Sequence, residues 1–224
     1  MDEAQLKQIA ATTQYVLLDF DGPVCDLFGN LTPDVIAASL LDELEGVLGG
    51  PVDEELADID DPLDLLDGVS EIYPELIGRV DASVRDAEVD AAELAEVTPG
   101  AEAFLAACAE GGLRVAIVSN NGAEAVRALL EMHGLAGFVQ HVEGRDPDPR
   151  LMKPDPTPLL RAMTALDARP ESTVMIGDSP SDMLAASAAG VAAIALLSTP
   201  PARSGPPWVS RMSELASLFG APRT

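Results

Sequence analysis

Apolar runs of strand length recur along the chain, and segments with helical periodicity separate them. The runs at residues 15–18, 114–118, 173–176 and 191–196 predict strands, and residues 138–142 form a weaker run of the same kind. Because these runs are apolar throughout instead of alternating with polar residues, they are typical of strands buried on both faces of a sheet.

The segments between the runs predict helices at residues 101–110, 123–133, 156–166 and 181–189. Gly134 and Gly190 stand where two of these helices should end, a common place for glycine. Alternating strands and helices indicate an α/β fold, a doubly wound, Rossmann-like parallel sheet with helices on both faces.

One long segment breaks this alternation, since residues 25–95 contain helical patterns and no convincing strand. Thr32, Pro33 and Asp34 form a typical helix start, and Gly49 and Gly50 mark its end. Further helices are predicted at residues 62–78 and 80–95. We therefore expect an all-helical module at 25–95 inserted into an α/β core of residues 1–24 and 96–224. Residues 198–207, with four prolines, predict a loop before a closing helix at 212–218.

Negative charge is concentrated in the predicted helical module. The whole chain has a formal net charge of −25, and residues 25–95 carry 20 acidic and two basic side chains, a net charge of −18. Such a surface argues against binding nucleic acid or an anionic membrane through a broad patch. A small anionic substrate is still compatible with it, because a metal ion in a pocket can invert the local field. Solubility or a salty environment would also explain the acidity.

Other sequence features predict a cytoplasmic protein. The amino-terminal segment is too polar for a signal peptide, and no apolar run reaches the roughly 18 residues of a membrane span. The two cysteines, Cys25 and Cys108, do not have metal-ligand or disulfide spacing, and Cys25 is interpreted as a packed thiol. No obligate protein partner is evident.

Polar side chains that could carry out chemistry follow the predicted strands. The carboxyl ends of parallel strands meet at one edge of a sheet, where ligands bind in open α/β folds. An Asp-x-Asp pair can hold a hard cation and still leave an oxygen for nucleophilic attack, and a following glycine allows a sharp turn. The residues concerned are Asp19, Asp21 and Gly22 after the first strand, Ser119 and Asn120 after the second, Lys153 in a loop, and Asp178 and Asp182 after a later strand.

These motifs, in this order, resemble those of the haloacid dehalogenase (HAD) superfamily. Asp19-Phe20-Asp21-Gly22 is similar to its first motif, Ile117-Val118-Ser119-Asn120 to the second, Lys153-Pro154 to the third, and the GDSPSD sequence at 177–182 to the fourth. The resemblance covers essentially the whole chain. It implies a phosphatase-like member, similar to phosphoglycolate phosphatases, in which residues 25–95 form a helical (C1-type) cap on a catalytic core of residues 1–24 and 96–224. Its substrate would be a small phosphorylated metabolite.

The resemblance also implies roles for the residues. Asp19 would attack phosphorus and form an aspartyl-phosphate, and Asp21 would act as general acid and then as general base. Ser119 would donate a hydrogen bond to the phosphoryl group, and Lys153 would hold the nucleophile and offset charge. Mg²⁺ would bind the carboxylates of Asp19 and Asp178 and the backbone carbonyl of Asp21, with Asp182 orienting the site. Asp19 should then stay ionised.

Alternatives within and beyond this family remain. Asp21 argues against dehalogenase chemistry, and the absence of a lysine from the predicted cap argues against phosphonate cleavage. A phosphosugar mutase would use the same residues, and a non-catalytic interaction protein could share the fold. The first motif continues with Pro23 where phosphatases usually have Thr or Val, and this departure stiffens the exit toward the cap.

The remaining polar residues receive ordinary structural interpretations. His133 and His141 are interpreted as non-catalytic, and Arg145 and Arg150 as solvated loop arginines. Trp208 is expected to pack the C-terminal segment. Asn120 and Asn121 could be turn residues or line the pocket.

Overall fold

Parallel strands form a central six-stranded sheet in the computed structural model, which describes residues 3–201 and 205–220. Leu18 pairs with Ile117 on one side and with Ile176 on the other, so three strands end at nearly the same level. The strand order is β5 (His141–Glu143), β4 (Arg114–Val118), β1 (Tyr15–Leu18), β6 (Thr173–Gly177), β7 (Ala192–Leu196) and β8 (Trp208–Val209).

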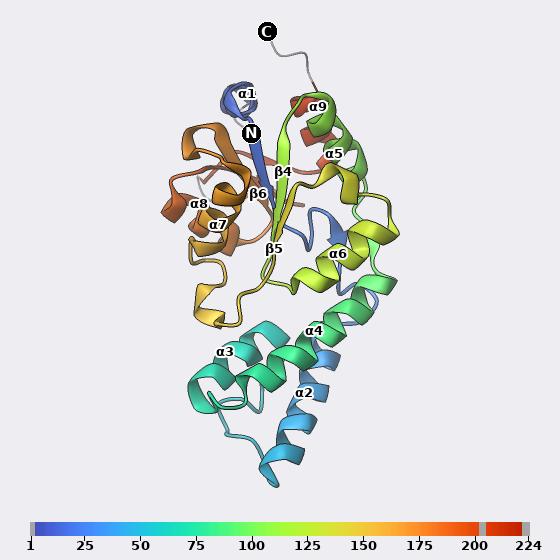
Figure 1. The fold of residues 1–224 in the computed structure, drawn as a ribbon, viewed down its shortest axis with the longest axis vertical. Helices are drawn as coiled ribbons and strands as arrows, with labels where there is room; N and C mark the ends of the chain where they lie inside the picture. Colours follow the sequence, from blue (N-terminus) through green and yellow to red (C-terminus); the bar gives the residue numbers. More distant parts are fainter. Residues whose placement is uncertain (1–2, 202–204, 221–224) are drawn as a thin grey trace.

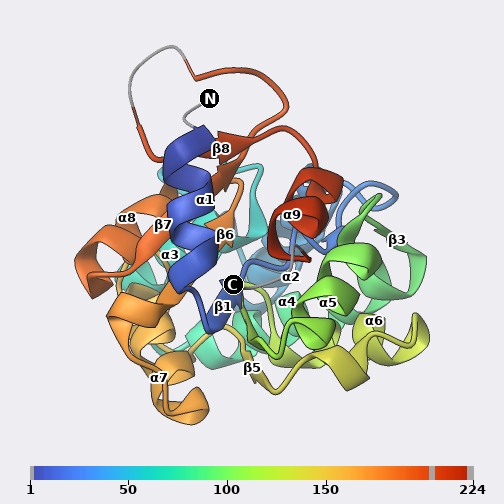
Figure 2. The same ribbon diagram turned by 90° about the horizontal axis from the view of Figure 1, so that it is seen from above.

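Helices cover both faces of this sheet (Figure 2). Val16 and Leu18 of β1 pack toward the helices α5 (Ala101–Glu110), α6 (Ala123–Met132) and α9 (Met212–Phe219). Leu17, between them, packs toward α7 (Thr157–Leu166) and α8 (Pro180–Ala189). This alternation places apolar side chains in both layers, as expected for a strand buried on both faces. The predicted doubly wound α/β class is thus confirmed.

The segment between β1 and β4 forms a helical lobe beside the carboxyl edge of the sheet (Figure 1). It contains α2 (Pro33–Leu48), α3 (Pro62–Ile72) and α4 (Ile77–Leu94), which share a buried cluster of their own that includes Leu40, Leu66 and Val84. The short strands β2 (Cys25–Asp26) and β3 (Glu96–Val97) pair antiparallel where the chain leaves the sheet and returns to it. No strand at Cys25 was predicted from the sequence.

Several predicted bounds differ from the structure. The helix expected at 62–78 ends at Ile72, because Pro74 disfavours helical backbone at Tyr73, and α4 starts at Ile77. The strand expected at 138–142 is shorter and later, since residues Ala136–Phe138 form a 3₁₀ turn before β5. Helix α1 (Glu3–Thr12), which packs against α9, and strand β8 were not predicted.

Other predicted features agree with the structure or fall partly outside it. Gly49 ends α2 in the left-handed conformation, with φ 71°. Cys25 and Cys108 are buried and form no disulfide. The proline-rich loop at 198–207 includes residues 202–204, which lie outside the described residues. Among the described helices, none is long and apolar enough to cross a bilayer.

Candidate active site

Asp19 and Lys153 form the centre of the site at the carboxyl edge of the sheet. Asp19 directly follows β1 and is only 7% exposed. Its Oδ1 accepts hydrogen bonds from the Phe20 amide at 2.8 Å and from Lys153 Nζ at 2.7 Å. Lys153 Nζ also donates to Asp182 Oδ1 at 2.6 Å and to the Val118 carbonyl at 2.9 Å. All three ammonium donors are therefore used, and groups from β1, β4 and α8 fix its position.

Two further carboxylates lie beside this pair. Asp178 follows β6, and one oxygen each of Asp19, Asp178 and Asp182 lie within 4.8 Å of one another. Asp182 is fully buried, and its Oδ2 accepts from the Ser179 amide at 3.1 Å in a capping box that starts α8. Because both Asp182 oxygens already accept hydrogen bonds, its geometry favours orienting Lys153 over direct coordination of a metal ion.

The charges in this cluster do not balance, since three carboxylates share a single ammonium. Burial raises the pKa of Asp19 to about 7, and the Asp182 carboxylate adds to the rise although Lys153 opposes it. Burial, followed by repulsion from Asp182, raises the pKa of Asp178 to about 6. Although burial alone would lower the pKa of Lys153, Asp19 and Asp182 raise it, so the ammonium stays charged. A bound divalent cation would neutralise this excess negative charge.

The turn after Asp19 brings the backbone close to Asp178. Gly22 has φ +89°, and a Cβ placed on it would lie 2.0 Å from Asp178 Oδ2, so only glycine fits there. The Asp21 carboxylate accepts from the Leu27 amide at 2.8 Å, and burial raises the pKa of Asp21. Pro23 is buried inside the same turn.

Ser119 and Asn120 follow β4 and lie beside the lysine loop. Ser119 is buried, and its Oγ donates to Asn121 Oδ1 at 3.1 Å and accepts from the Asn121 amide at 3.0 Å. Asn120 Oδ1 accepts from the Lys153 amide at 2.8 Å, and Asn120 Nδ2 donates to the Lys153 carbonyl at 2.9 Å. Asn120 therefore anchors the backbone of the lysine loop, a role beyond that of a simple turn residue.

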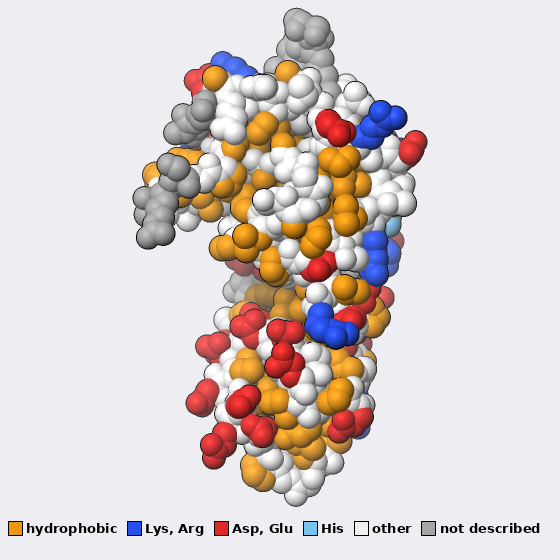
Figure 3. Space-filling model, turned by 90° about the vertical axis from the view of Figure 1, so that its left-hand side faces the viewer, with side chains coloured by type: hydrophobic (Ala, Val, Ile, Leu, Met, Phe, Trp, Pro, Cys, Tyr) orange, Lys and Arg blue, Asp and Glu red, His pale blue; other side chains and the backbone are white. Residues whose placement is uncertain are grey.

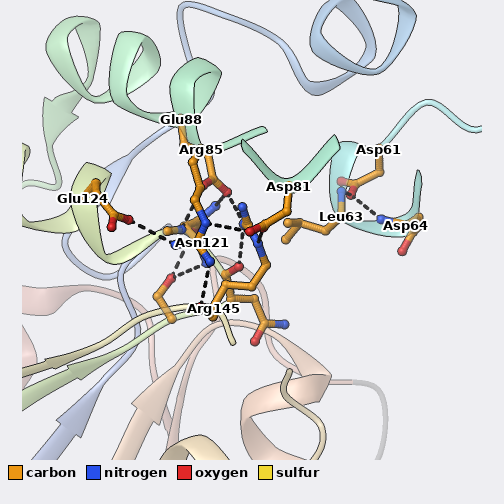
Figure 4. A network of polar contacts seen from close by, with 12 residues as sticks. Asp61, Leu63, Asp64, Asp81, Arg85, Glu88, Asn121, Glu124 and Arg145 are labelled. Atoms are coloured by element: carbon orange, nitrogen blue, oxygen red, sulfur yellow. Dashed lines mark hydrogen bonds and ion pairs between the residues drawn. The ribbon is translucent and has the colours of Figure 1, made fainter. Parts of the chain in front are cut away.

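The interpretation of Arg145 as a solvated loop arginine was wrong. Its side chain is 0% exposed and pairs with Asp81 and Glu88 of α4 (Figure 4). Glu88 was missed in the sequence analysis, although it follows Val80 and Val84 at helical spacing on the buried face of α4. An acid on an apolar stripe is the signal that could have revealed it.

Other residues with ordinary interpretations remain outside the site. Arg150 is 80% exposed at its side chain and pairs with Asp148, as a surface arginine would. His141 Nε2 lies 3.0 Å from Glu143 Oε2. Trp208 lies in β8, beside β7.

A cleft of about 970 Å³ separates the helical lobe from the core and reaches Lys153 and Asn120. The wall formed by α3 and the residue before it is acidic, whereas Arg150, Lys153 and Asp155 lie on the core side. The acidic residues of this wall are Asp61, Asp64, Asp67 and Glu71. Acidic side chains gather over the helical lobe in the space-filling view (Figure 3).

Comparisons with known proteins bear on this site. Residues 13–190 match the family described as haloacid dehalogenase-like hydrolase. The chain is 32% identical to a plasmid-encoded phosphoglycolate phosphatase of Cupriavidus necator, with 79% of this chain and 77% of that protein covered. It is 40% identical to the phosphoglycolate phosphatase of Rhodospirillum rubrum over 46% of this chain, and that match spans only 42% of the relative.

Solved structures show the same fold. The structure of CbbY from Rhodobacter sphaeroides in complex with phosphate aligns with a TM-score of 0.65 at 20% sequence identity. The alignment covers 91% of this chain and 96% of that one. It thus includes both the sheet and the helical lobe.

Proposed function

Since the chain belongs to the haloacid dehalogenase-like hydrolases, as its motifs predicted, we propose that it is a Mg²⁺-dependent phosphatase acting on a small phosphomonoester. The observation that carries this proposal is Asp19 at a strand end, 2.7 Å from Lys153 Nζ, with the Asp178 and Asp182 carboxylates alongside. This arrangement provides a nucleophile, a fixed positive charge and ligands for a hard cation within one cluster, in which Asp19 and Asp182 are buried and Asp178 is exposed.

Asp19 attacks phosphorus, and the bond to the leaving oxygen breaks as the bond to the Asp19 carboxylate forms. Asp21 donates a proton to the leaving oxygen, a task suited to a carboxyl group whose pKa is raised by burial. Asp21 then accepts a proton from the water that attacks phosphorus, and phosphate leaves as the Asp19 carboxylate reforms. Ser119 donates to a phosphoryl oxygen, and Lys153 keeps Asp19 in place.

Asp19 and Asp178 would hold the metal ion together with the Asp21 carbonyl. The excess of carboxylates over ammonium groups in the cluster fits a divalent cation. When bound, Mg²⁺ would offset the negative charge of the phosphoryl oxygens. With this charge present, Asp19 remains ionised at neutral pH despite its burial.

We assign residues 25–95 to a cap and residues 1–24 and 96–224 to the catalytic core. The separate buried cluster shared by α2, α3 and α4 and the β2–β3 pair at the junction support this division. The cap closes the cleft over the substrate, excludes water and contacts the leaving group, while the core holds the phosphoryl group.

The test is phosphate release from a panel of phosphomonoesters, including p-nitrophenyl phosphate, with and without Mg²⁺. We expect Mg²⁺-dependent release that is lost in Asp19→Asn. Asp148→Asn is a matched control, because it removes a carboxylate that pairs with Arg150 on the surface. Normal release by Asp19→Asn would overturn the proposed mechanism. Isomerisation of a sugar phosphate that needs a sugar bisphosphate as activator would instead identify a mutase.

A further inference from the structure

Arg145 connects the core to α4 through two carboxylates, the buried Glu88 and the half-buried Asp81 (Figure 4). Arg145 Nε donates to Asp81 Oδ1 at 2.8 Å, and Arg145 Nη1 donates to Glu88 Oε1 at 2.6 Å. The side chains of Arg145 and Glu88 are 0% and 1% exposed. The attraction between Arg145 and Glu88 must therefore overcome the free-energy cost of removing both charges from water. Arg145 Nη2 adds to this cost, because it is buried without a hydrogen-bond partner among the described residues.

Glu88 extends from this pair to the loop at residues 119–122. Its Oε1 also accepts from Asn121 Nδ2 at 3.1 Å, and its Oε2 accepts from the Gly122 amide at 2.8 Å. A carboxylate can only accept hydrogen bonds, so the amide nitrogen of Asn121 must face Glu88. Asn121 Oδ1 is thereby directed at the Ser119 hydroxyl, 3.1 Å away.

The same loop carries two groups of the proposed active site. The Asn121 amide donates to Ser119 Oγ at 3.0 Å and holds this oxygen in place, while the hydroxyl hydrogen can turn toward a phosphoryl oxygen. Arg145 Nη1 donates to the Asn120 carbonyl at 3.0 Å, and the Arg145 amide donates to the Asn121 carbonyl at 2.8 Å. Asn120 in turn anchors the backbone of Lys153. Contacts from Glu88 and Arg145 thus reach Asn120, Asn121 and Gly122, and through Asn121 they reach Ser119.

We propose that Glu88 is a positioning residue for catalysis, held in place by Arg145, and that it fixes the phosphoryl-binding loop at residues 119–122 from helix α4. This inference rests on the proposed function for its catalytic consequence. A hydrogen-bond donor contributes to a phosphoryl-transfer reaction only when it is already placed where charge develops. The Glu88–Arg145 pair therefore holds the loop at residues 119–122 in position, and its formation costs desolvation free energy.

Glu88→Gln tests this role directly. The amide cannot satisfy the loop, because its NH₂ group must face either the Gly122 amide or Asn121 Nδ2, which are both donors. We expect kcat to fall by about 10- to 100-fold with KM changed less than about threefold, since misplacing a catalytic group affects the transition state most.

Asp81→Asn is the matched control, because Asp81 lies on the same helix and pairs with the same Arg145. Asp81 otherwise contacts Arg85, and its hydrogen bonds to the described residues include none to the 119–122 loop. We expect its kcat to stay within about threefold of wild type. Equal losses of kcat in Glu88→Gln and Asp81→Asn would overturn the proposal, because they would indicate a general effect of the buried charges.

A second measurement does not depend on turnover. In the metal-free protein, we expect hydrogen exchange of the Gly122 amide to accelerate in Glu88→Gln and to stay unchanged in Asp81→Asn. Unchanged exchange in Glu88→Gln would overturn the positioning role, whereas an inactive wild type with the expected exchange pattern would overturn only the proposed phosphatase. If Glu88→Gln fails to fold, Asn121→Ser breaks the same connection and leaves the Glu88–Arg145 pair intact. A normal kcat in that variant would also contradict the proposal.

Discussion

Gly22 shows how one residue determines the geometry of the acidic cluster. Its positive φ would strain the backbone of any other residue, and its close approach to Asp178 leaves no space for a side chain. The turn therefore depends on glycine for two independent reasons, the backbone conformation and the carboxylate beside it. Because Asp178 is also a proposed metal ligand, a change at Gly22 should affect stability and metal binding together.

Gly22→Ala should destabilise the protein by about 1–3 kcal/mol and weaken Mg²⁺ binding, since the new Cβ must displace Asp178. Chemical denaturation and calorimetric titration with Mg²⁺ measure the two effects. Gly46→Ala is the control, because a Cβ there meets nothing within 4 Å on α2. That change should stabilise the helix by about 0.5–1 kcal/mol. Unaltered Mg²⁺ affinity in Gly22→Ala would contradict the assignment of Asp178.

The raised pKa values of Asp19 and Asp178 predict how pH affects the metal-free protein and its affinity for Mg²⁺. The pKa of Asp19 rises from 3.8 to about 7, so between these values the folded state holds a proton that the unfolded chain has released. Stability without metal should therefore fall as pH rises through this window. Mg²⁺ must displace the same proton, so its affinity should increase from about pH 5 to about pH 8. A pH-independent affinity would mean that these carboxylates do not bind the ion.

The sequence predicted the residues around Asp19 because each follows an apolar run or belongs to a known motif. It could not predict the partners of Arg145, since Glu88 lies 57 residues away and only the packing of α4 against the core brings them together. A charged residue in a loop is usually solvated, and that general tendency led to the wrong interpretation.

At the scale of elements, helix ends were predictable where Gly or Pro restricts the backbone. The end of α2 at Gly49, in a left-handed conformation, was predicted. The break after Ile72 follows from Pro74 but was missed, because one helix was expected to continue to residue 78. Strand β8 could not be predicted, because it has only two residues and depends on pairing with β7. Short edge strands of this kind are defined by tertiary contacts more than by local pattern.

The proposed cap should respond as a unit to the loss of its own buried cluster. Leu66 of α3 is 0% exposed, and Leu66→Ala should cost about 2–5 kcal/mol. Hydrogen exchange should accelerate in α2, α3 and the first half of α4, and it should stay slow in β1, β4 and β6. Leu184→Ala on α8 is the control, since Leu184 is 59% exposed. Uniform acceleration in the sheet as well would contradict a cap that is a separate unit.

At the scale of the whole molecule, the two sides of the cleft differ in the charged groups that they carry. The core holds Lys153 beside the proposed metal ligands, whereas Asp61, Asp64, Asp67 and Glu71 line the opposite wall of the cleft. Because the metal-free cluster has more carboxylates than ammonium groups, we expect a bound cation to be what attracts the phosphoryl group to the core. We expect the acidic wall of the cap to repel a negatively charged leaving group. We therefore expect the wall to favour neutral or amine-bearing leaving groups.

Phosphoethanolamine and phosphoglycolate provide a direct comparison, since they are similar in size and differ in the charge of the leaving group. At low salt, kcat/KM should be higher for phosphoethanolamine, and the ratio should shrink as salt screens the acidic wall. In the double variant Asp64→Asn/Asp67→Asn, the ratio of kcat/KM for phosphoethanolamine to that for phosphoglycolate should be smaller even without added salt. A preference for phosphoglycolate that does not depend on salt would show that the wall does not contact the leaving group.

Trapping a phosphoryl group on Asp19 tests the central claim most directly. The Asp21→Asn variant should form the aspartyl-phosphate from p-nitrophenyl phosphate, whose leaving group needs no proton, and should hydrolyse it slowly for lack of a general base. After rapid acid quenching, mass spectrometry should find one added phosphoryl group on the peptide that contains residue 19, and none in the Asp19→Asn/Asp21→Asn control. A phosphoryl group on another residue, or release of p-nitrophenol with no trapped phosphoryl group, would contradict Asp19 as the nucleophile.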